Sequence, residues 1–328
     1  MKKIFKILFI NILILLIIFL LIELFLHFTK ENHLRFDRIL GWSLKENLNI
    51  TKTETDFYGE KYNVNFKTQK NGIITYGKNN INEILVIGDS FSTDPYVSTD
   101  KMWYSIFAEK LKKIKDIDIK VNVIGAGGYG TFQQYLLLKK LKSNFKPKLI
   151  IIQFCTNDFE NNYLKSEKLT GSINQYSRRP YLQNEEIKYS QDNVSKLLRF
   201  KLIGQSRIIN KILFIFSKNR KKLNIPDDDY LYSRNITINI LKKIKEIYPN
   251  KNYLIFNCNI DNINLNLLSK KTKMIPVNSI YEALLKAQEK NEKIYYRDGG
   301  HYNEYGHRII GNSLFEYFIQ KNLINHLK

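Results

Sequence analysis

The chain has 328 residues and carries 52 Lys and Arg against 31 Asp and Glu, a formal net charge of +21. Its hydrophobic content of 44% is ample for a buried core, which excludes general disorder. Two cysteines exclude a disulfide framework and a Cys-rich zinc site. The basic residues are spread along the whole chain without a nucleic-acid-binding signature, so we expect a solvated basic surface and no nucleic-acid partner; attraction to an anionic lipid or acidic glycan is the alternative.

Residues 1–28 are predicted to form a signal-anchor or transmembrane helix. The stretch 7–28 is apolar except for Asn11, Glu23 and His27, and as a helix it would span roughly 33 Å, enough to cross a bilayer core. Lysines precede it, which favours a cytoplasmic N-terminus and a periplasmic or extracytoplasmic remainder. The apolar run has no Ala-x-Ala site at its end, so an uncleaved anchor is favoured over a cleaved signal peptide.

Residues 29–82 are polar and are interrupted by short aromatic runs. The run 62–66 alternates apolar and polar residues like a half-buried strand. We interpret this segment as a lead-in with short strands rather than a separate domain.

From residue 83 onward, short apolar runs alternate with helical patterns. Strands are predicted at 83–88, 121–124, 148–154 and 253–258, and helices at 102–115, 131–141, 236–248, 279–290 and 302–323. Such alternation predicts an α/β fold with a parallel sheet covered by helices on both faces.

The alternation breaks at about residues 159–233, which we interpret as an insertion over the carboxyl ends of the strands, where such folds carry lids and pockets. Residues 197–216 within it are apolar at helical spacing. A lid for a lipid substrate is one interpretation of this run, and packing of a helix against the sheet is the favoured one.

A candidate nucleophile follows the first predicted strand. Gly88-Asp89-Ser90 forms a tight strand-to-helix turn that would expose a serine oxygen and point backbone N–H groups at the space above it. An ordinary Asp/Ser helix cap would fit the same residues.

Two further strand ends carry candidate hydrogen-bond donors. The glycine-rich run 125–130 lacks the downstream acidic residue and the spacing of a dinucleotide site, so a turn that brings an N–H group toward a pocket fits better. Asn157 follows the third strand, and its side-chain amide could donate to an oxyanion. An Asn-Asp turn is the alternative for this residue.

Near the C-terminus, Asp298 precedes His301 by three residues. An acid at this spacing can hydrogen-bond the ring and fix its tautomer, and the histidine could then accept a proton from a serine. A metal site at His301 and His307 would need a third ligand, which no neighbouring histidine supplies, so we expect no metal and interpret His307 as an ordinary helix residue.

Together these blocks resemble the SGNH (GDSL-type) hydrolase family over roughly residues 83–328. Gly88-Asp89-Ser90, Gly128, Asn157 and the pair Asp298 and His301 match its four blocks in order and spacing. The runs 40–44 and 128–133 are also similar to a bacterial membrane-anchored branch of that family.

The resemblance implies a three-layer, flavodoxin-like fold and a set of roles. Ser90 would attack an ester carbonyl, His301 would act as base and then acid, and Asp298 would orient His301. The N–H groups of Ser90 and Gly128 and the side chain of Asn157 would form the oxyanion hole. No metal or cofactor is implied.

Two residues depart from the family pattern, since Phe91 stands where Leu is usual and Cys155 where Gly is usual. The second change bears on the oxyanion hole and therefore on substrate choice. In the family's strand order Cys155 and Cys258 end neighbouring strands, so a disulfide is conceivable, but small buried hydrophobic residues are the favoured interpretation.

The functional hypothesis is an envelope-anchored serine esterase that removes acyl groups, with acetyl as the favoured case, from a cell-envelope or extracellular glycan. An O-acyltransferase with the same acyl-serine is the principal alternative, because only the acceptor differs. A lipid esterase and an inactive scaffold are weaker alternatives. The partners expected are an acylated glycan or other small ester, the membrane through the N-terminal helix, and polysaccharide-assembly proteins of the envelope.

Overall fold

The structure is a computed structural model, and it describes residues 2–29, 33–56, 59–78, 82–170, 178–190, 206, 208, 223–260 and 265–327. The apolar run 197–216, with its predicted helix, therefore lies outside the described residues except for Ser206 and Ile208.

A six-stranded sheet in the order β12-β11-β8-β6-β7-β5 forms the centre of the fold. Its strands are β5 (Ile74–Tyr76), β6 (Glu83–Gly88), β7 (Lys120–Gly125), β8 (Leu149–Phe154), β11 (Asn252–Asn257) and β12 (Ile275–Pro276). β6 and β8 are buried along their whole length, as continuous apolar runs in a parallel sheet should be. Neighbours from β7 to β12 pair in parallel, which confirms the predicted parallel sheet and its flavodoxin-like order.

Edge strand β5 pairs antiparallel with β7 and comes from the lead-in, so the sheet is mixed and residues 29–82 contribute to it. The lead-in also forms two hairpins, one from β1 (Leu34–Asp37) and β2 (Gly41–Leu44), the other from β3 (Asn49–Thr55) and β4 (Lys61–Lys67). The alternation predicted for 62–66 is present, because Val64 and Phe66 of β4 are buried in the same core as the sheet.

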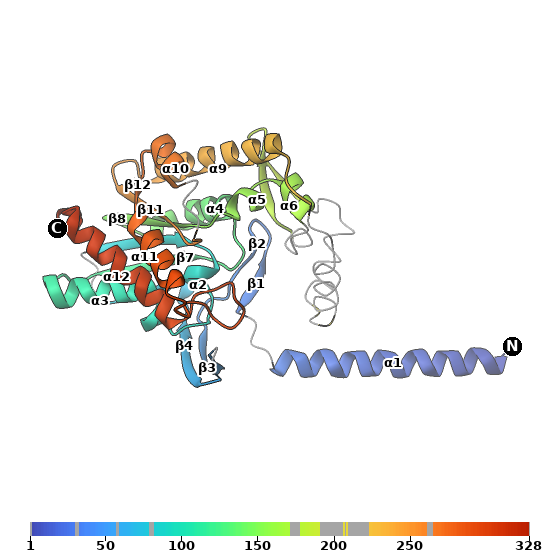
Figure 1. Ribbon diagram of the computed structural model, residues 1–328. Coiled ribbons are helices and arrows are strands. Elements are labelled where there is room, and N and C mark those ends of the chain that lie inside the picture. The colour runs from blue at the N-terminus through green and yellow to red at the C-terminus, as the bar shows by residue number, and fades with distance from the viewer. Residues whose placement is uncertain are drawn as a thin grey trace.

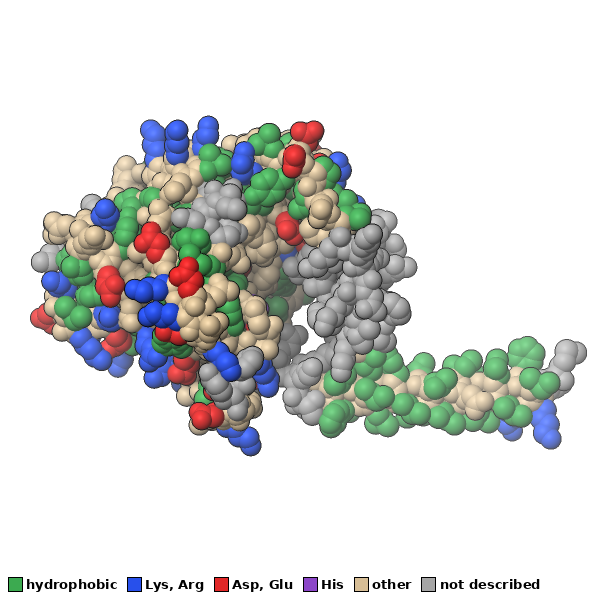
Figure 2. All heavy atoms as spheres, in the orientation of Figure 1, with side chains coloured by type: hydrophobic (Ala, Val, Ile, Leu, Met, Phe, Trp, Pro, Cys, Tyr) green, Lys and Arg blue, Asp and Glu red, His purple; other side chains and the backbone are tan. Residues whose placement is uncertain are grey.

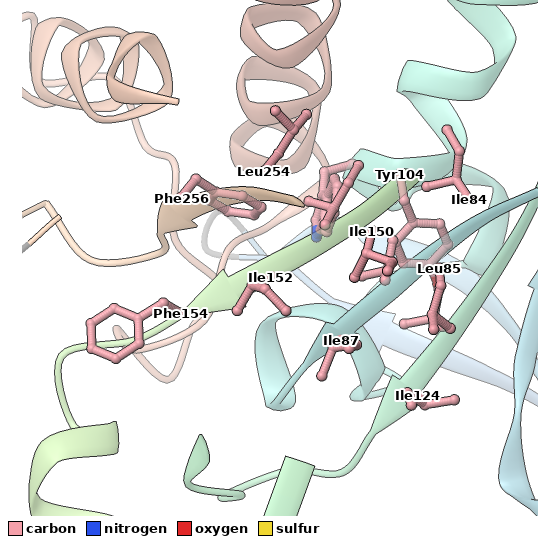
Figure 3. Close-up of a cluster of buried hydrophobic side chains, with 14 of the residues drawn as sticks. Ile84, Leu85, Ile87, Tyr104, Ile124, Ile150, Ile152, Phe154, Leu254 and Phe256 are labelled. Carbon is pink, nitrogen blue, oxygen red and sulfur yellow. The ribbon is translucent and has the colours of Figure 1, made fainter. Parts of the chain in front are cut away.

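Helices cover both faces of the sheet (Figure 1). They are α3 (Trp103–Lys115), α4 (Thr131–Leu141), α9 (Asp227–Ile247), α10 (Leu265–Thr272), α11 (Asn278–Glu289) and α12 (Glu304–Gln320). α3, α11 and α12 pack together on one side, and α4, α9 and α10 form the other layer. Between them, apolar side chains from β6, β8 and β11 form the buried core shown in Figure 3.

The second half of the chain departs from the predicted bounds in two places. α9 begins at Asp227 rather than 236, because Pro226 precedes it and three aspartates fill its first turn, where negative charge favours a helix N-terminus. α10 and β12 were not predicted, being only eight and two residues long.

The predicted insertion contributes two short helices and a hairpin among the described residues. These are α5 (Asp158–Asn161), α6 (Leu164–Thr170) and the pair β9 (Pro180–Gln183) and β10 (Glu186–Tyr189). α5 and α6 both pack against α9, so this part of the insertion is joined to one helical layer.

Helix α1 (Lys2–Thr29) projects from the folded body with apolar side chains around its circumference and lysines at its N-terminal end (Figures 1 and 2). Within the described residues, Lys3–Leu26 is one helix long and apolar enough to cross a membrane. A membrane anchor and a signal sequence both have this form, so the helix fits the predicted N-terminal span and leaves its topology open to experiment.

Cys155 and Cys258 form a disulfide, which corrects the interpretation of these cysteines as small buried hydrophobic residues. Phe154 of β8 pairs in register with Asn257 of β11, so the two cysteines come directly after paired positions. Their Cα atoms are 5.2 Å apart, within the usual range for a disulfide. Both residues lie just beyond the last residue of their strand, where the pleat no longer directs their side chains to one face.

We expect the disulfide to make a measurable contribution to stability. It links residues 103 apart in the sequence, so its loss should lower the free energy of unfolding by about 2 to 4 kcal/mol. Thermal and urea unfolding of the full chain with and without reductant, together with the double variant Cys155→Ser/Cys258→Ser, measures this. Two alkylatable thiols in the denatured, unreduced protein would contradict the pairing.

Candidate active site

The candidate site residues occupy loops at one edge of the sheet, where β6, β7 and β8 end. In parallel strands the carboxyl ends meet at the same edge, and loops there are free to carry chemistry. Gly88 of β6 lies directly opposite Gly125 of β7, and β6 also pairs with β8. This register brings the Ser90 turn, the glycine loop and the Asn157 turn to adjacent positions.

Ser90 is the first residue of the short helix α2 (Ser90–Thr93), and Asp89 caps that helix by accepting from the Phe91 backbone N–H at 3.1 Å. The helix cap is thus present together with a serine that is only partly buried, so the two interpretations of Gly88-Asp89-Ser90 are compatible. Ser90 itself is half-buried, whereas Asp89 is almost completely buried.

Gln153, in the middle of the sheet on β8, supports this turn from below. Its side-chain oxygen accepts from the Asp89 backbone N–H at 3.0 Å and from the Ser92 hydroxyl at 2.9 Å. Its side-chain nitrogen donates to Asp89 Oδ1 at 2.9 Å. A Cβ atom on Gly88 would lie 2.4 Å from the Gln153 oxygen, so a side chain there would displace the Gln153 amide from these hydrogen bonds.

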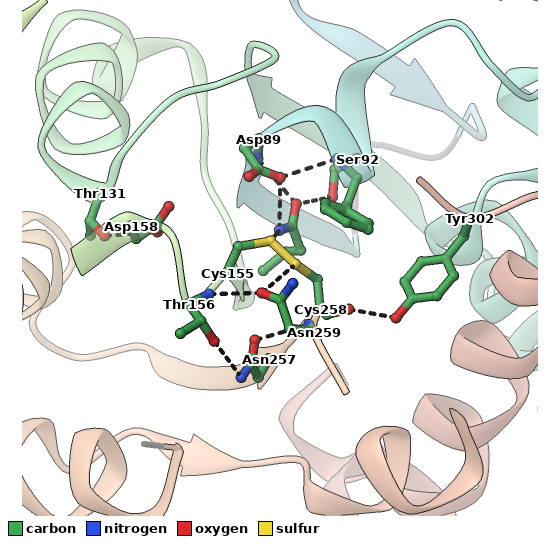
Figure 4. Close-up of a disulfide and its surroundings, with 12 residues drawn as sticks. Asp89, Ser92, Thr131, Cys155, Thr156, Asp158, Asn257, Cys258, Asn259 and Tyr302 are labelled. Atoms are coloured by element: carbon green, nitrogen blue, oxygen red, sulfur yellow. Dashed lines mark hydrogen bonds between the residues drawn. A yellow bond between two sulfur atoms is a disulfide. The ribbon is translucent and has the colours of Figure 1, made fainter. Parts of the chain in front are cut away.

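Two carboxyl groups are buried beneath the site. Burial raises the pKa of Asp89 to about 6, although the Phe91 N–H group and the Gln153 amide favour the ionised form. Burial, and secondly the charge of Asp89, raise the pKa of Asp158 well above its usual range. Asp158 accepts from the Thr131 hydroxyl at 2.8 Å, which ties the turn after Asn157 to the start of α4. Figure 4 shows both carboxyl groups and the disulfide that lies near them.

The glycine loop approaches the Ser90 turn closely. Gly125 has a φ of +153°, and a Cβ atom there would lie 1.9 Å from the carbonyl oxygen of Gly88, so only glycine fits. Gly128 has a φ of +74°, a conformation that favours glycine. A Cβ atom on Gly127 would meet the carboxylate of Asp94, the residue that follows α2, at 2.6 Å.

Asn157 precedes α5 and is exposed. Its backbone carbonyl accepts from the Asn161 N–H group at 2.9 Å, and its side chain does not cap the helix. The side-chain amide is therefore not committed to the turn that the alternative interpretation required, and it is available to a ligand.

Asp298 and His301 form a hydrogen-bonded pair. Asp298 Oδ2 lies 2.6 Å from His301 Nδ1, and Oδ1 accepts from the backbone N–H groups of Gly300 at 2.9 Å and His301 at 3.0 Å. Partial burial acts to raise the pKa of Asp298, but these hydrogen bonds outweigh it, and the pKa lies below its ordinary value. The carboxylate therefore stays ionised at neutral pH, and it contacts Nδ1 of the ring rather than Nε2.

Aromatic rings place His301 beside the Ser90 turn. Its ring lies 5.2 Å from that of Phe91, which follows Ser90, and 4.7 Å from that of Tyr96. Among the described residues no hydrogen bond joins the Ser90 hydroxyl to the His301 ring; catalytic hydrogen bonds often tighten only when substrate binds. The structure thus places the His301 ring against Phe91, the residue that follows Ser90.

The lead-in holds the loop that carries His301. Glu54 of β3 accepts from the Tyr296 hydroxyl at 2.5 Å and pairs with Arg297 at 3.1 Å. The other Glu54 oxygen pairs with Lys52 at 2.6 Å. Glu54, which lies outside the four sequence blocks, therefore anchors the chain just before the Asp298–His301 turn.

His307 is buried in α12, and burial lowers the pKa of its ring to about 3, so the side chain is neutral. This agrees with its interpretation as an ordinary helix residue. Within the described ranges, no group of three or more His, Cys, Asp or Glu side chains is arranged to hold a metal ion.

Gln153 and Glu54 were missed at the sequence level. Gln153 could have been found, because it is a lone polar residue in an otherwise apolar strand that is buried on both faces, and such a residue needs a partner. Glu54 is one of many charged residues in a polar hairpin, and no sequence pattern marks it.

The sequence profile of the family described as GDSL-like lipase/acylhydrolase matches residues 84–314 of this chain. The chain therefore belongs to this family, and it is an ester-hydrolysing enzyme of the SGNH type. A search of curated protein sequences finds no match to it.

Solved structures that resemble the chain include several esterases at low sequence identity. The lipase/acylhydrolase from Enterococcus faecalis has a TM-score of 0.42 and 12% identity over 73% of this chain and 96% of that one. The psychrotrophic esterase EstA from Pseudoalteromonas sp. has a TM-score of 0.40 and 13% identity, with coverages of 74% and 98%. For the acetyl xylan esterase AlAXEase these values are 0.38, 13%, 72% and 98%. Likenesses at this level do not identify a substrate.

The buried carboxyl of Asp89 should make stability depend on pH. A carboxyl with a folded-state pKa of about 6 and an ordinary value of 3.8 binds its proton more tightly when folded, so stability falls as pH rises between these values. Asp89→Asn keeps the cap and removes the buried charge. We expect it to raise the free energy of unfolding at pH 8 by an amount on the order of 1 to 3 kcal/mol, and by much less at pH 4.

Urea unfolding of the full chain at pH 4, 6 and 8 measures this difference. Asp100→Asn, at an exposed position, is the matched control and should change the unfolding free energy little at any of the three pH values. An Asp89→Asn protein that is less stable than the parent at pH 8 would contradict the prediction.

Proposed function

We propose that the enzyme removes short O-acyl groups, with acetyl as the leading case, from a glycan of the cell envelope. The observation that carries the proposal is the Asp298–His301 pair held against Phe91, the residue next to Ser90. This pairing supports a serine nucleophile with a histidine base, which is the arrangement that ester hydrolysis through an acyl-enzyme requires.

In the proposed reaction, Ser90 Oγ attacks the ester carbonyl carbon and His301 Nε2 takes the hydroxyl proton. The tetrahedral oxyanion accepts hydrogen bonds from the N–H groups of Ser90 and Gly128 and from the side-chain amide of Asn157. The bond to the glycan oxygen then breaks, and His301 returns the proton to that oxygen. Water attacks the acyl-serine by the same route, which releases the carboxylic acid and restores Ser90. Asp298 holds the ring and stabilises its protonated form.

Aromatic side chains support a short acyl group. The Phe91 ring packs against His301 and, at 5.3 Å between centroids, against Tyr302, while the Tyr96 ring packs against His301 and Tyr296. These rings occupy space beside the nucleophile. A groove of about 620 Å³ between α3 and α12 is lined by none of the candidate site residues, so a long acyl chain does not gain a binding channel there.

Two features support a location outside the cytoplasm. The disulfide is typical of an oxidising compartment. The lysines before the apolar part of α1 favour retention of the N-terminus in the cytoplasm. We therefore propose a single-pass protein with an N-terminal anchor (1–28), a lead-in (29–82) and an extracytoplasmic hydrolase domain (83–328), which would meet envelope glycans and their assembly proteins.

The proposal is tested with the full chain in detergent, a fluorophosphonate probe, and nitrophenyl esters of acetate and palmitate. We expect labelling and acetate-selective turnover, both lost in Ser90→Ala and both retained in Ser313→Ala, a buried α12 serine. Turnover by folded Ser90→Ala equal to the parent would contradict the proposal.

Product analysis with an acetylated glycan and a hydroxyl acceptor then separates hydrolysis from acyl transfer. Free acetate supports the esterase, and transfer without net hydrolysis supports an O-acyltransferase.

Replacing the anion that orients His301 should damage turnover without unfolding the protein. Asp298→Asn removes the charge that accepts from the ring and from two backbone N–H groups, so we expect kcat to fall by roughly 10² to 10⁴-fold. Asp118→Asn, which loses a surface carboxylate paired with Lys112, is the control and should keep full turnover. Unchanged kcat in Asp298→Asn would remove Asp298 from the proposed role.

A further inference from the structure

We propose that Trp42 and Arg179 are positioning residues that hold the Gly127–Gly128 peptide in the orientation its N–H group needs to serve the oxyanion hole. Trp42 comes from the lead-in and Arg179 from the insertion, so neither belongs to the recognised blocks. The inference rests on the proposed function, in which the Gly128 N–H group is an oxyanion donor.

Trp42 controls one side of this peptide. Its indole Nε1–H donates to the carbonyl oxygen of Gly127 at 2.9 Å. The peptide is trans and planar, so its C=O and N–H bonds point in opposite directions within one plane. Because the carbonyl oxygen of Gly127 points toward the indole, the N–H of Gly128 points away from it. A hydrogen bond to the carbonyl also polarises the amide and strengthens its N–H as a donor.

Arg179 controls the next carbonyl. Its guanidinium donates through Nη2 to the carbonyl oxygen of Gly128 at 2.7 Å and through Nη1 to the side chain of Gln133 at 2.5 Å. Arg179 is fully buried and pairs at 3.2 Å with Glu167, which is also fully buried and accepts from the Tyr181 hydroxyl. The guanidinium is therefore fixed from the insertion side before it contacts the glycine loop.

Further contacts close the arrangement into one network. The Arg179 guanidinium lies 5.1 Å from the centre of the Trp42 ring, the Tyr129 hydroxyl donates to the Trp42 carbonyl, and the Gln133 amide donates to the Leu40 carbonyl at 2.7 Å. The lead-in, the glycine loop and the insertion are thus joined around two peptide groups.

The glycine loop needs such restraint. Two successive glycines have unusually large backbone freedom. Gly128 adopts a positive φ, and it has no side chain whose contacts could hold the backbone in that conformation. A fully buried Arg–Glu pair is weak evidence for a stabilising role, because desolvation offsets much of its attraction. The hydrogen bond from Arg179 to the carbonyl oxygen of Gly128 explains the position of this pair better.

The test compares Trp42→Phe, which keeps an aromatic ring but loses the N–H donor, and Arg179→Lys with the parent enzyme. Each is made in the full chain and measured for kcat and KM on nitrophenyl acetate, for thermal stability, and for inhibition by phenylboronic acid, which forms a tetrahedral adduct with a serine. We expect kcat to fall by roughly tenfold to a hundredfold with KM little changed, because a misplaced donor loses most of its effect in the transition state. The boronate inhibition constant should rise by a similar factor.

Arg178→Lys is the matched control, because the neighbouring Arg178 stacks on Tyr189 and contacts the Arg38 carbonyl but not the glycine loop. Unchanged kcat in Trp42→Phe, or an equal loss in Arg178→Lys, would overturn the inference. If Arg179→Lys does not fold, Trp42→Phe decides the question, with Trp42→Tyr as a second ring that lacks the indole donor. Ser90→Ala in the same assay keeps the two proposals apart: turnover equal to the parent there refutes the proposed function. An inactive Ser90→Ala together with a fully active Trp42→Phe refutes the positioning role alone.

Discussion

The candidate site depends on the hydrogen bonds of the Gln153 side-chain amide. It bonds the backbone and the carboxyl of Asp89 and the hydroxyl of Ser92, so one side chain of the central strand fixes both ends of the turn that presents Ser90. Its oxygen also leaves no room for a side chain at Gly88. The sheet therefore does more than support the turn, because a polar side chain of β8 determines the path of the backbone from the end of β6 to Ser90.

The parts of the site that could be predicted from sequence are those with local signatures. Ser90, Gly128 and Asn157 each follow a recognisable apolar strand, and parallel pairing must bring such strand ends to one edge. Asp298 and His301 lie three residues apart and make their hydrogen bond within a single turn. Short-range spacing and one topological rule were enough for these residues.

The remaining contacts have no such signature. Trp42 donates to Gly127, 85 residues away in the sequence, and Arg179 to Gly128, 51 residues away. The run 40–44 has a family similarity, but nothing in that run or around Arg179 indicates the partner. The disulfide was not favoured from the sequence for a related reason. Whether Cys155 and Cys258 can pair depends on where their two strands end, and strand ends are hard to place from an apolar run. The sheet topology could be predicted from the sequence, whereas the side chains that contact the loops at the edge of the sheet were found only in the structure.

The junction between α1 and the folded body limits the distance between them. α1 ends at Thr29 and β1 begins at Leu34, so four residues separate them, and fully extended they cover at most about 14 Å. With α1 as an anchor, the folded body would stay close to the bilayer surface and could not diffuse away from it. An enzyme held in this way would act only on esters that come within reach of that surface, so encounter would depend on the movement of the substrate rather than on that of the enzyme.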